Sequence, residues 1–336
     1  MAGIVNAGLY VPLRRITLAE ISKAWGGQGS ADEISVPGLD EDAFTLALNA
    51  AKDALENAAI NADEVGMICI NTVSHNKFPL APRVAFGLGM RADARVHDFA
   101  LSTRGTTQSI LTCLDAVRAE FIRFGLVIGV EVPLPEPGSA DEMSWGAAAS
   151  ALVIGDRDLA LTVSGSSSYS SAFTERWTVA SSPFRKETAF PRFGRDMGYV
   201  DHVFNASSTL FNLLNLKPED LKLAIFQESA SIDRAAKRLR IPQERLLRSQ
   251  SGKFFGDTGS AALPLSLIEG SGKVESNDKL LMASYGIGGS DALCLVAQRP
   301  EKMRGAVRKL QAFWDKKNYI DYPTLLRHRR IIGYAG

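Results

Sequence analysis

The chain is poor in the residues that carry disulfide and metal chemistry. Of its 336 residues, three are cysteine and four are histidine. The cysteines, Cys69, Cys113 and Cys294, stand apart in apolar stretches with no paired spacing, which argues against a disulfide framework and against a zinc site. We therefore expect a protein of a reducing compartment, cytoplasmic and without a metal.

An excess of charge of one sign and a long apolar run are also absent. Lysine and arginine number 38 against 37 acidic residues, so the net charge is +1 and no overall field attracts nucleic acid or a membrane surface. No apolar run reaches the roughly 18 residues that a membrane-spanning helix needs, and Met1 to Pro12 lacks the pattern of a signal peptide. We expect neither nucleic acid nor membrane as a partner. The hydrophobic content of 46% is enough for a large core.

Helical and apolar strand patterns alternate along the first half. The clearest helix is Ala43 to Ala59, which follows three acids that suit a helix N-terminus. An acidic turn and an apolar strand centred on Met67 to Ile70 come next, and this order is typical of a parallel-sheet unit. The other expected elements are strands at 3–11, 95–101, 126–130, 151–154 and 159–164 and helices at 82–90 and 107–123. Residues 14–39 are expected to form a short helix and a surface loop.

The second half repeats this order. A helix at 199–215 precedes the acidic turn 217–221 and a strand at 223–226, which match the turn 61–65 and the strand 67–70. A helix opening at Gly256 and strands at 279–284 and 292–297 follow. This repetition predicts an α/β fold of two βαβ-rich halves. We expect boundaries at 1–165 for the first half, 166–198 for a surface excursion, 199–300 for the second half and 301–336 for a tail.

Two segments carry a resemblance to a known family. They are the glycine-rich turn Ser284 to Ala292 and the tail Tyr319 to Pro323, which is followed by the basic run Arg327 to Arg330. Together with the order of elements, they resemble the archaeal-type hydroxymethylglutaryl-CoA synthases over nearly the whole chain. The resemblance implies the thiolase fold, a five-layer α-β-α-β-α sandwich, and a dimer. It also implies chemistry through an acyl-enzyme on a cysteine, coenzyme A or acyl-CoA as ligand, and no covalently bound cofactor.

The residues at the family's catalytic positions do not suit that chemistry. The resemblance places Ser102 at the nucleophilic cysteine, Gln227 at the histidine, Val73 at the glutamate and Asp257 at the asparagine. A serine hydroxyl is far less nucleophilic than a thiolate and needs a base within about 3 Å. A glutamine cannot relay a proton. We therefore expect a degenerate member of the family with no catalytic residue at these positions.

Other residues have a functional and a plain structural interpretation. His75, on a loop near the site, is a ligand-binding candidate, and Glu228 and Asp257 are candidate bases. Cys113 lies mid-helix and is expected to be a buried structural residue. The basic run near the C-terminus either contacts a CoA phosphate or a partner or is solvated. The glycine-rich turn either binds a ligand or is a tight turn between strands, and its candidates are Gly286, Gly288, Gly289 and Ser290.

Three hypotheses for the function follow. The first is a non-catalytic subunit of a thiolase or acyltransferase complex, in which another chain carries the catalytic residues. The resemblance implies its partners: a second copy or a thiolase-like subunit as a homodimer or heterodimer, and a small zinc-ribbon/OB-fold protein. The second is a stand-alone acyltransferase or thioesterase that uses Ser102 in place of the cysteine. The third is an acyl-CoA-binding protein without turnover.

Overall fold

The main body of the protein is a large mixed sheet. The structure, a computed structural model, describes residues 1–27, 32–74, 78–177, 182, 184, 186–187 and 191–333. The strands of this sheet are β1 (Gly3–Tyr10), β4 (Val65–Thr72), β5 (Arg95–Ala100), β6 (Phe124–Glu131), β7 (Ala148–Gly155), β8 (Leu161–Ser170), β11 (Leu223–Phe226), β12 (Lys279–Ala283) and β13 (Gly289–Ala297). Within the described residues these nine strands are ordered β11-β12-β13-β8-β1-β7-β6-β4-β5.

The sheet consists of two similar parts. In the first part β4 is parallel to β5 and β6, and β7 is antiparallel to β6 and β1. In the second part β11 is parallel to β12, and β13 is antiparallel to β12 and β8. The two parts join where Gly3 and Ile4 of β1 pair with Thr162 and Leu161 of β8. The predicted duplication of an α/β unit is confirmed.

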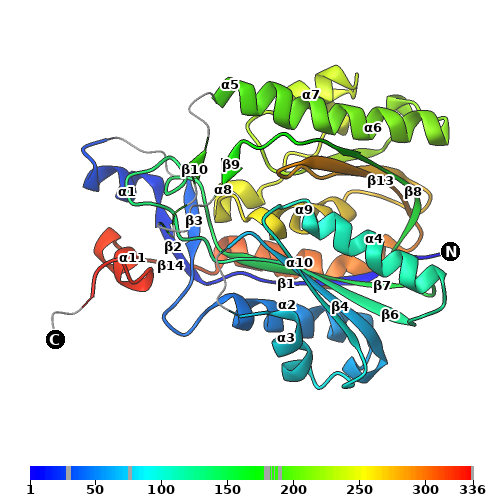
Figure 1. Ribbon diagram of the computed structural model, residues 1–336, viewed down its shortest axis with the longest axis horizontal. Helices are drawn as coiled ribbons and strands as arrows, with labels where there is room; N and C mark the ends of the chain where they lie inside the picture. Colours follow the sequence, from blue (N-terminus) through cyan, green and yellow to red (C-terminus); the bar gives the residue numbers. More distant parts are fainter. Residues whose placement is uncertain are drawn as a thin grey trace.

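Helices lie on both outer sides of the sheet and between its two parts (Figure 1). α2 (Ala43–Ala58) and α3 (Ala81–Leu88) cover the first part, and α6 (Asp201–Leu214) and α7 (Ile232–Arg238) cover the second. α4 (Gly105–Arg118) and α9 (Ala262–Ser271) form the central layer. All ten residues of α9 are buried, as a helix between two sheet layers requires. The elements form five layers, α-β-α-β-α.

Two regions differ from the sequence prediction. Residues 14–39, expected as a short helix and a loop, contain β2 (Arg14–Thr17) and β3 (Glu33–Val36) as well as α1 (Leu18–Ala24). The serine-rich segment after Ser164, expected as a surface excursion, continues as β8 to Ser170 and crosses the expected boundary at 165. The segment was missed because it lacks the alternation of apolar and polar residues that predicts a strand. Backbone ladder bonds to β13 and side-chain bonds, such as that from the Ser167 hydroxyl to the Ala206 carbonyl at 2.5 Å, hold it in the sheet.

Short elements complete the chain. They are β9 (Arg176–Trp177), β10 (Lys186–Glu187), α5 (Pro191–Phe193), the π-helical segment Gly194–Val200, α8 (Ser251–Phe255) and the 3-10 turns Ala62–Glu64, Pro218–Asp220, Gln243–Arg245, Gly259–Ala261 and Pro300–Met303. α4 ends at Arg118, five residues before the predicted end at Arg123, because the chain turns at Glu120, whose φ is +59°. No helix of the described residues has the length and apolar character needed to span a membrane.

The C-terminal tail packs on the chain itself. After α10 (Arg304–Asp315), β14 (Asn318–Tyr319) adds to β2, and α11 (Tyr322–His328) covers the small apolar cluster formed with β2, α1 and β3. Behind α11, Arg329 Nη1 lies 3.1 Å from the fully buried Glu142 Oε1, and the Tyr322 hydroxyl donates to the same carboxylate at 3.2 Å. Arg329 therefore pairs with a carboxylate of this chain, while Arg327 and Arg330 are exposed, and a contact of the basic run with a CoA phosphate or a partner stays a prediction.

Candidate functional site

Ser102 lies between β5 and α4, at the position expected for the nucleophile. Its hydroxyl donates to the carbonyl oxygen of Ile287 at 3.2 Å, and this is its one hydrogen bond among the described residues. Its own carbonyl accepts from the Asn71 amide at 3.1 Å, and that amide also lies 3.0 Å from Ser260 Oγ. No base of the described residues is placed to accept the proton of Ser102. His75 lies outside those residues.

Gln227 and Asp257 meet at one glycine. The Gln227 Nε2 donates to the carbonyl oxygen of Gly259 at 3.0 Å, and the Gly259 N–H donates to Asp257 Oδ1 at 2.9 Å. Ser260, the next residue, links to Asn71 and thus to the Ser102 segment. The structure brings the expected catalytic positions 102, 227 and 257 around this turn, but their polar side chains are bonded to the main chain rather than to one another.

Glu131, at the end of β6, lies beside Val73, the position that the resemblance assigns to the family's glutamate. The Val73 N–H donates to its Oε1 at 2.8 Å and the Ser74 hydroxyl to its Oε2 at 2.5 Å. Burial raises the pKa of the Glu131 carboxyl, although bonds from Ser260 and Ser74 oppose that shift. Sequence reasoning missed Glu131 because it follows directly on the apolar run of a buried strand, where no motif distinguishes it.

The glycine-rich turn packs against the Ser102 segment. A Cβ on Gly286 would stand 2.2 Å from Ser102 Oγ, and a Cβ on Gly289 would stand 2.2 Å from the Arg104 Nη1, so both glycines are needed for this close approach. Gly288 has a φ of +84°. Ser290 is fully buried and its hydroxyl donates to the Ser284 carbonyl at 2.5 Å. A ligand-binding role for these four residues stays a prediction.

A buried carboxylate that the sequence did not single out holds the turn to α4. Asp291, fully buried on β13, accepts from Arg104 Nε at 3.0 Å and Nη2 at 2.8 Å. It also accepts from Thr107 and Gln108 of α4 at 2.7 Å and from Ser168 of β8 at 2.6 Å. The Arg104 guanidinium compensates its charge and the three neutral side chains add hydrogen bonds, so this network fixes the segment that contains Ser102.

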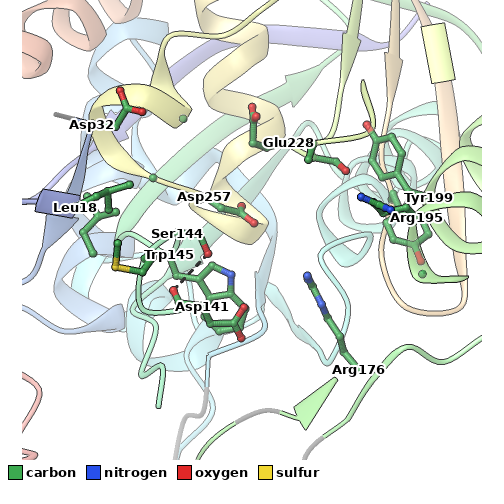
Figure 2. A pocket seen from close by; sticks show the side chains of 18 of the residues that line it. Leu18, Asp32, Asp141, Ser144, Trp145, Arg176, Arg195, Tyr199, Glu228 and Asp257 are labelled. Carbon is green, nitrogen blue, oxygen red and sulfur yellow. Dashed lines mark hydrogen bonds between the residues drawn. The ribbon is translucent and has the colours of Figure 1, made fainter. Parts of the chain in front are cut away.

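A pocket of about 510 Å³ opens beside Asp257. Figure 2 shows Glu228 and Asp257 in its wall, with Arg176 and Arg195 farther along. Burial, and then the charges of Asp257 and Glu269, raise the pKa of Glu228 to about 7. A carboxyl that titrates near neutrality can take up or release a proton at physiological pH. Glu228 therefore fits the role of a candidate base better than Asp257.

The pocket has an acidic lining. Its carboxylate residues are Asp32, Glu33, Asp141, Glu175, Glu228 and Asp257. Tyr285 also lines it, and the next residue, Gly286, lies close to Ser102, which is not among the described residues that line the pocket. Sequence reasoning did not single out Arg176 and Arg195, which come from the irregular region 166–198. It also did not single out Tyr199, at the start of a predicted helix, or Tyr285, within the glycine-rich turn.

The cysteines lie in the core. Cys113 and Cys69 are fully buried with their sulfurs 3.8 Å apart. The hydrogen bond to Cys69, together with burial, raises the pKa of the Cys113 thiol well above its usual range. Its expected structural role fits this position. Among the described residues, no group of three or more histidine, cysteine, aspartate or glutamate side chains is arranged to hold a metal ion.

The five layers, the duplicated halves and the position of Ser102 at the start of a central helix define the thiolase fold. A solved synthase of the curacin pathway, an HMG synthase in complex with acetyl donor-ACP, aligns with a TM-score of 0.86 and 17% identity over 100% of this chain and 90% of its own. An HMG-CoA synthase complexed with CoA aligns with a TM-score of 0.83 and 15% identity over 100% and 91%. No protein-family model matches the chain.

Sequence similarity is higher to an archaeal enzyme. The hydroxymethylglutaryl-CoA synthase of Archaeoglobus fulgidus is 32% identical over 99% of both chains. The chain belongs to the hydroxymethylglutaryl-CoA synthase family.

Proposed function

We propose that the chain is a non-catalytic subunit of a thiolase or acyltransferase complex that acts on acyl-CoA. One observation carries the proposal: the Ser102 hydroxyl is bonded to the Ile287 carbonyl, and no described base is in reach of it. Acyl transfer through a covalent intermediate needs a nucleophile hydrogen-bonded to a base. With Gln227 and Asp257 also bonded to Gly259, the C–C bond is made or broken by a partner subunit.

The proposed ligand is coenzyme A or an acyl-CoA. The pocket of about 510 Å³ lies within the size range of small-molecule sites, and because its carboxylates would repel the CoA phosphates, the proposed occupant of the pocket is the uncharged acyl-pantetheine end. A structural neighbour of the chain is described as complexed with CoA, which supports the same ligand here. The same pocket is also compatible with the third hypothesis, an acyl-CoA-binding protein without turnover. The second hypothesis, with Ser102 as nucleophile, has no comparable support from the geometry.

The proposed dimer contact is the edge of the sheet at β5. An edge strand offers unpaired backbone N–H and C=O groups to another chain. Val96 of β5 is 40% exposed, and Phe86 of the adjacent α3 is 88% exposed. Arg95, His97 and Asp98 of β5 are exposed as well, so this edge offers apolar and charged side chains to a second copy or a thiolase-like subunit. The small zinc-ribbon/OB-fold partner rests on the family resemblance.

The test compares the isolated chain with its complex. The tagged chain is purified from its native host, co-purifying proteins are identified by mass spectrometry, and acyl transfer from acyl-CoA is assayed in both samples. We expect a thiolase-like subunit to co-purify and only the complex to transfer the acyl group to a carbon acceptor, with Ser102→Ala leaving this transfer within about twofold of wild type, since a residue without a catalytic role costs little. Turnover by the isolated chain that Ser102→Ala abolishes would overturn the proposal.

A further inference from the structure

A second serine stands beside a histidine on the far side of the glycine-rich turn. Ser171 follows directly after β8, and its N–H donates to the Gly288 carbonyl at 3.0 Å. Its Oγ lies 2.7 Å from Nε2 of His202, in the first turn of α6. None of the positions expected from the family includes this pair.

The other ring nitrogen of His202 fixes the direction of that hydrogen bond. Nδ1 lies 2.6 Å from the carbonyl oxygen of Gly198. A carbonyl can only accept, so Nδ1 carries the proton, and in the neutral ring Nε2 is left with its lone pair. The Ser171 hydroxyl therefore donates to Nε2. Nucleophile, base and a group that orients the base are in the order that acyl-transferring serine sites use.

His202 and Ser171 differ in their exposure to solvent: the histidine is buried and the serine is exposed. The His202 ring is 3% exposed and lies among aromatic rings, with centroids 5.2 Å from Tyr169, 5.8 Å from Phe173 and 5.8 Å from Tyr285. Ser171 is exposed. The Ser171 Oγ also accepts from the Phe173 N–H at 3.0 Å, so two hydrogen bonds hold the hydroxyl while the residue stays exposed at the surface.

The surface around Ser171 favours an apolar acyl group. Phe193 is exposed and packs on Phe173, with ring centroids 5.0 Å apart, and Met197 beside Gly198 is also exposed. The N–H of Ala172, the residue after Ser171, makes no hydrogen bond within the described residues. An N–H next to the nucleophile is a common donor to the oxygen of a tetrahedral intermediate.

We propose that Ser171 and His202 form a nucleophile–base pair that accepts an apolar acyl group from an ester or thioester. The bond from Ser171 Oγ to the carbonyl carbon forms while the C–O or C–S bond breaks. His202 Nε2 takes the hydroxyl proton and passes it to the leaving alkoxide or thiolate. Water, deprotonated by the same nitrogen, then releases the acid and restores Ser171. The site goes beyond the proposed subunit function and does not depend on it.

The test uses a fluorophosphonate probe on the full chain. Attack by an activated serine forms an O–P bond, and fluoride leaves. We expect the label on Ser171 by peptide mass spectrometry, its loss in Ser171→Ala, and a labelling rate about a hundredfold lower in His202→Gln, the usual share of a general base. Ser276→Ala is the matched control, because Ser276 is also exposed but donates to a carbonyl, that of Gln298.

A second readout is hydrolysis of p-nitrophenyl butyrate by the same variants. It should fall with Ser171→Ala and stay within about twofold for Ser276→Ala, as a residue outside the pair contributes little. Wild-type protein that takes up no label, or label that persists in Ser171→Ala, overturns the inference. A label found on Ser102, and lost in Ser102→Ala, would instead contradict the proposal that the chain is a non-catalytic subunit. Failure of the Ser171 inference and failure of the subunit proposal are therefore distinguishable.

Discussion

At the scale of single residues, Glu228 is the group whose charge state matters most. Its carboxyl faces the pocket, and burial and the neighbouring acids raise its pKa from 4.5 to about 7. Folding therefore takes up a proton between about pH 4.5 and 7. The free energy of unfolding falls as the pH rises through this window and then levels off, because the folded state pays for the buried charge.

Replacing Glu228 by glutamine should remove this pH dependence. Glutamine carries no charge, so we expect Glu228→Gln to match the wild type near pH 4.5 and to be more stable by up to about 3.5 kcal/mol at pH 8, from 2.5 pKa units at about 1.4 kcal/mol each. Urea unfolding at several pH values measures the difference. Glu244→Gln, at an exposed glutamate, should show no such trend. A constant offset between Glu228→Gln and wild type at all pH values would contradict the shifted pKa.

The residue scale also marks the limit of sequence reasoning. Ser102, Gln227 and Asp257 were assigned through the family resemblance, which implies that the three positions lie around one site. Glu131 and Asp291 could not be predicted, because a single acid within an apolar strand carries no periodic signal. The pairing of Ser171 with His202 depends on the path of the chain after β8, which the sequence pattern did not define.

At the scale of elements, the C-terminal helix α11 depends on one buried ion pair. The side chains of Arg329 and Glu142 are 8% and 0% exposed, so removing one partner leaves a buried charge without compensation.

The serine-rich part of β8 is an element that the sequence pattern did not predict. Helices such as α2 were predicted from the spacing of their apolar residues. The serine-rich part of β8 has no such spacing, because backbone ladder bonds and serine hydroxyl groups hold it in the sheet.

Arg329→Met should destabilise the protein by about 3 kcal/mol, the usual cost of breaking a buried pair. Urea unfolding monitored by tryptophan fluorescence measures this cost. Adding Glu142→Gln to Arg329→Met should recover part of it, because the buried charge is then gone. Arg327→Met, at an exposed arginine two residues earlier, should cost less than about 1 kcal/mol. Equal effects of Arg327→Met and Arg329→Met would show that the buried pair is not what holds the tail.

At the scale of the whole molecule, the edge of the sheet predicts self-association or pairing with a related subunit. The duplicated architecture itself could be predicted, because the order of helix, acidic turn and strand occurs twice. Which edge stays open could not, because the strand order depends on crossovers that the sequence pattern leaves undetermined. β5 ends the sheet of the described residues, with Val96 among its exposed side chains.

We expect the purified chain to have twice its mass of 36.3 kDa in light scattering. Val96→Lys should shift it toward the monomer, because a charge on an edge strand opposes strand pairing. Leu213→Lys, at an exposed leucine of α6 on another face, should not. A monomeric wild type would leave the heterodimer as the form to test, and a dimer insensitive to Val96→Lys would place the contact elsewhere.

The central position of β1 has a consequence for synthesis on the ribosome. β1 is made first, but its neighbours β7 and β8 begin only at Ala148 and Leu161, and β8 in turn pairs with β13, which ends at Ala297. The nascent chain thus carries an apolar strand without partners until Ala148 to Thr162 are made, near the middle of its 336 residues, and such exposed edges are prone to aggregate. A chain released before Ala297 would leave β8 without its full partner, so a late stop codon should yield insoluble protein rather than a shortened active one.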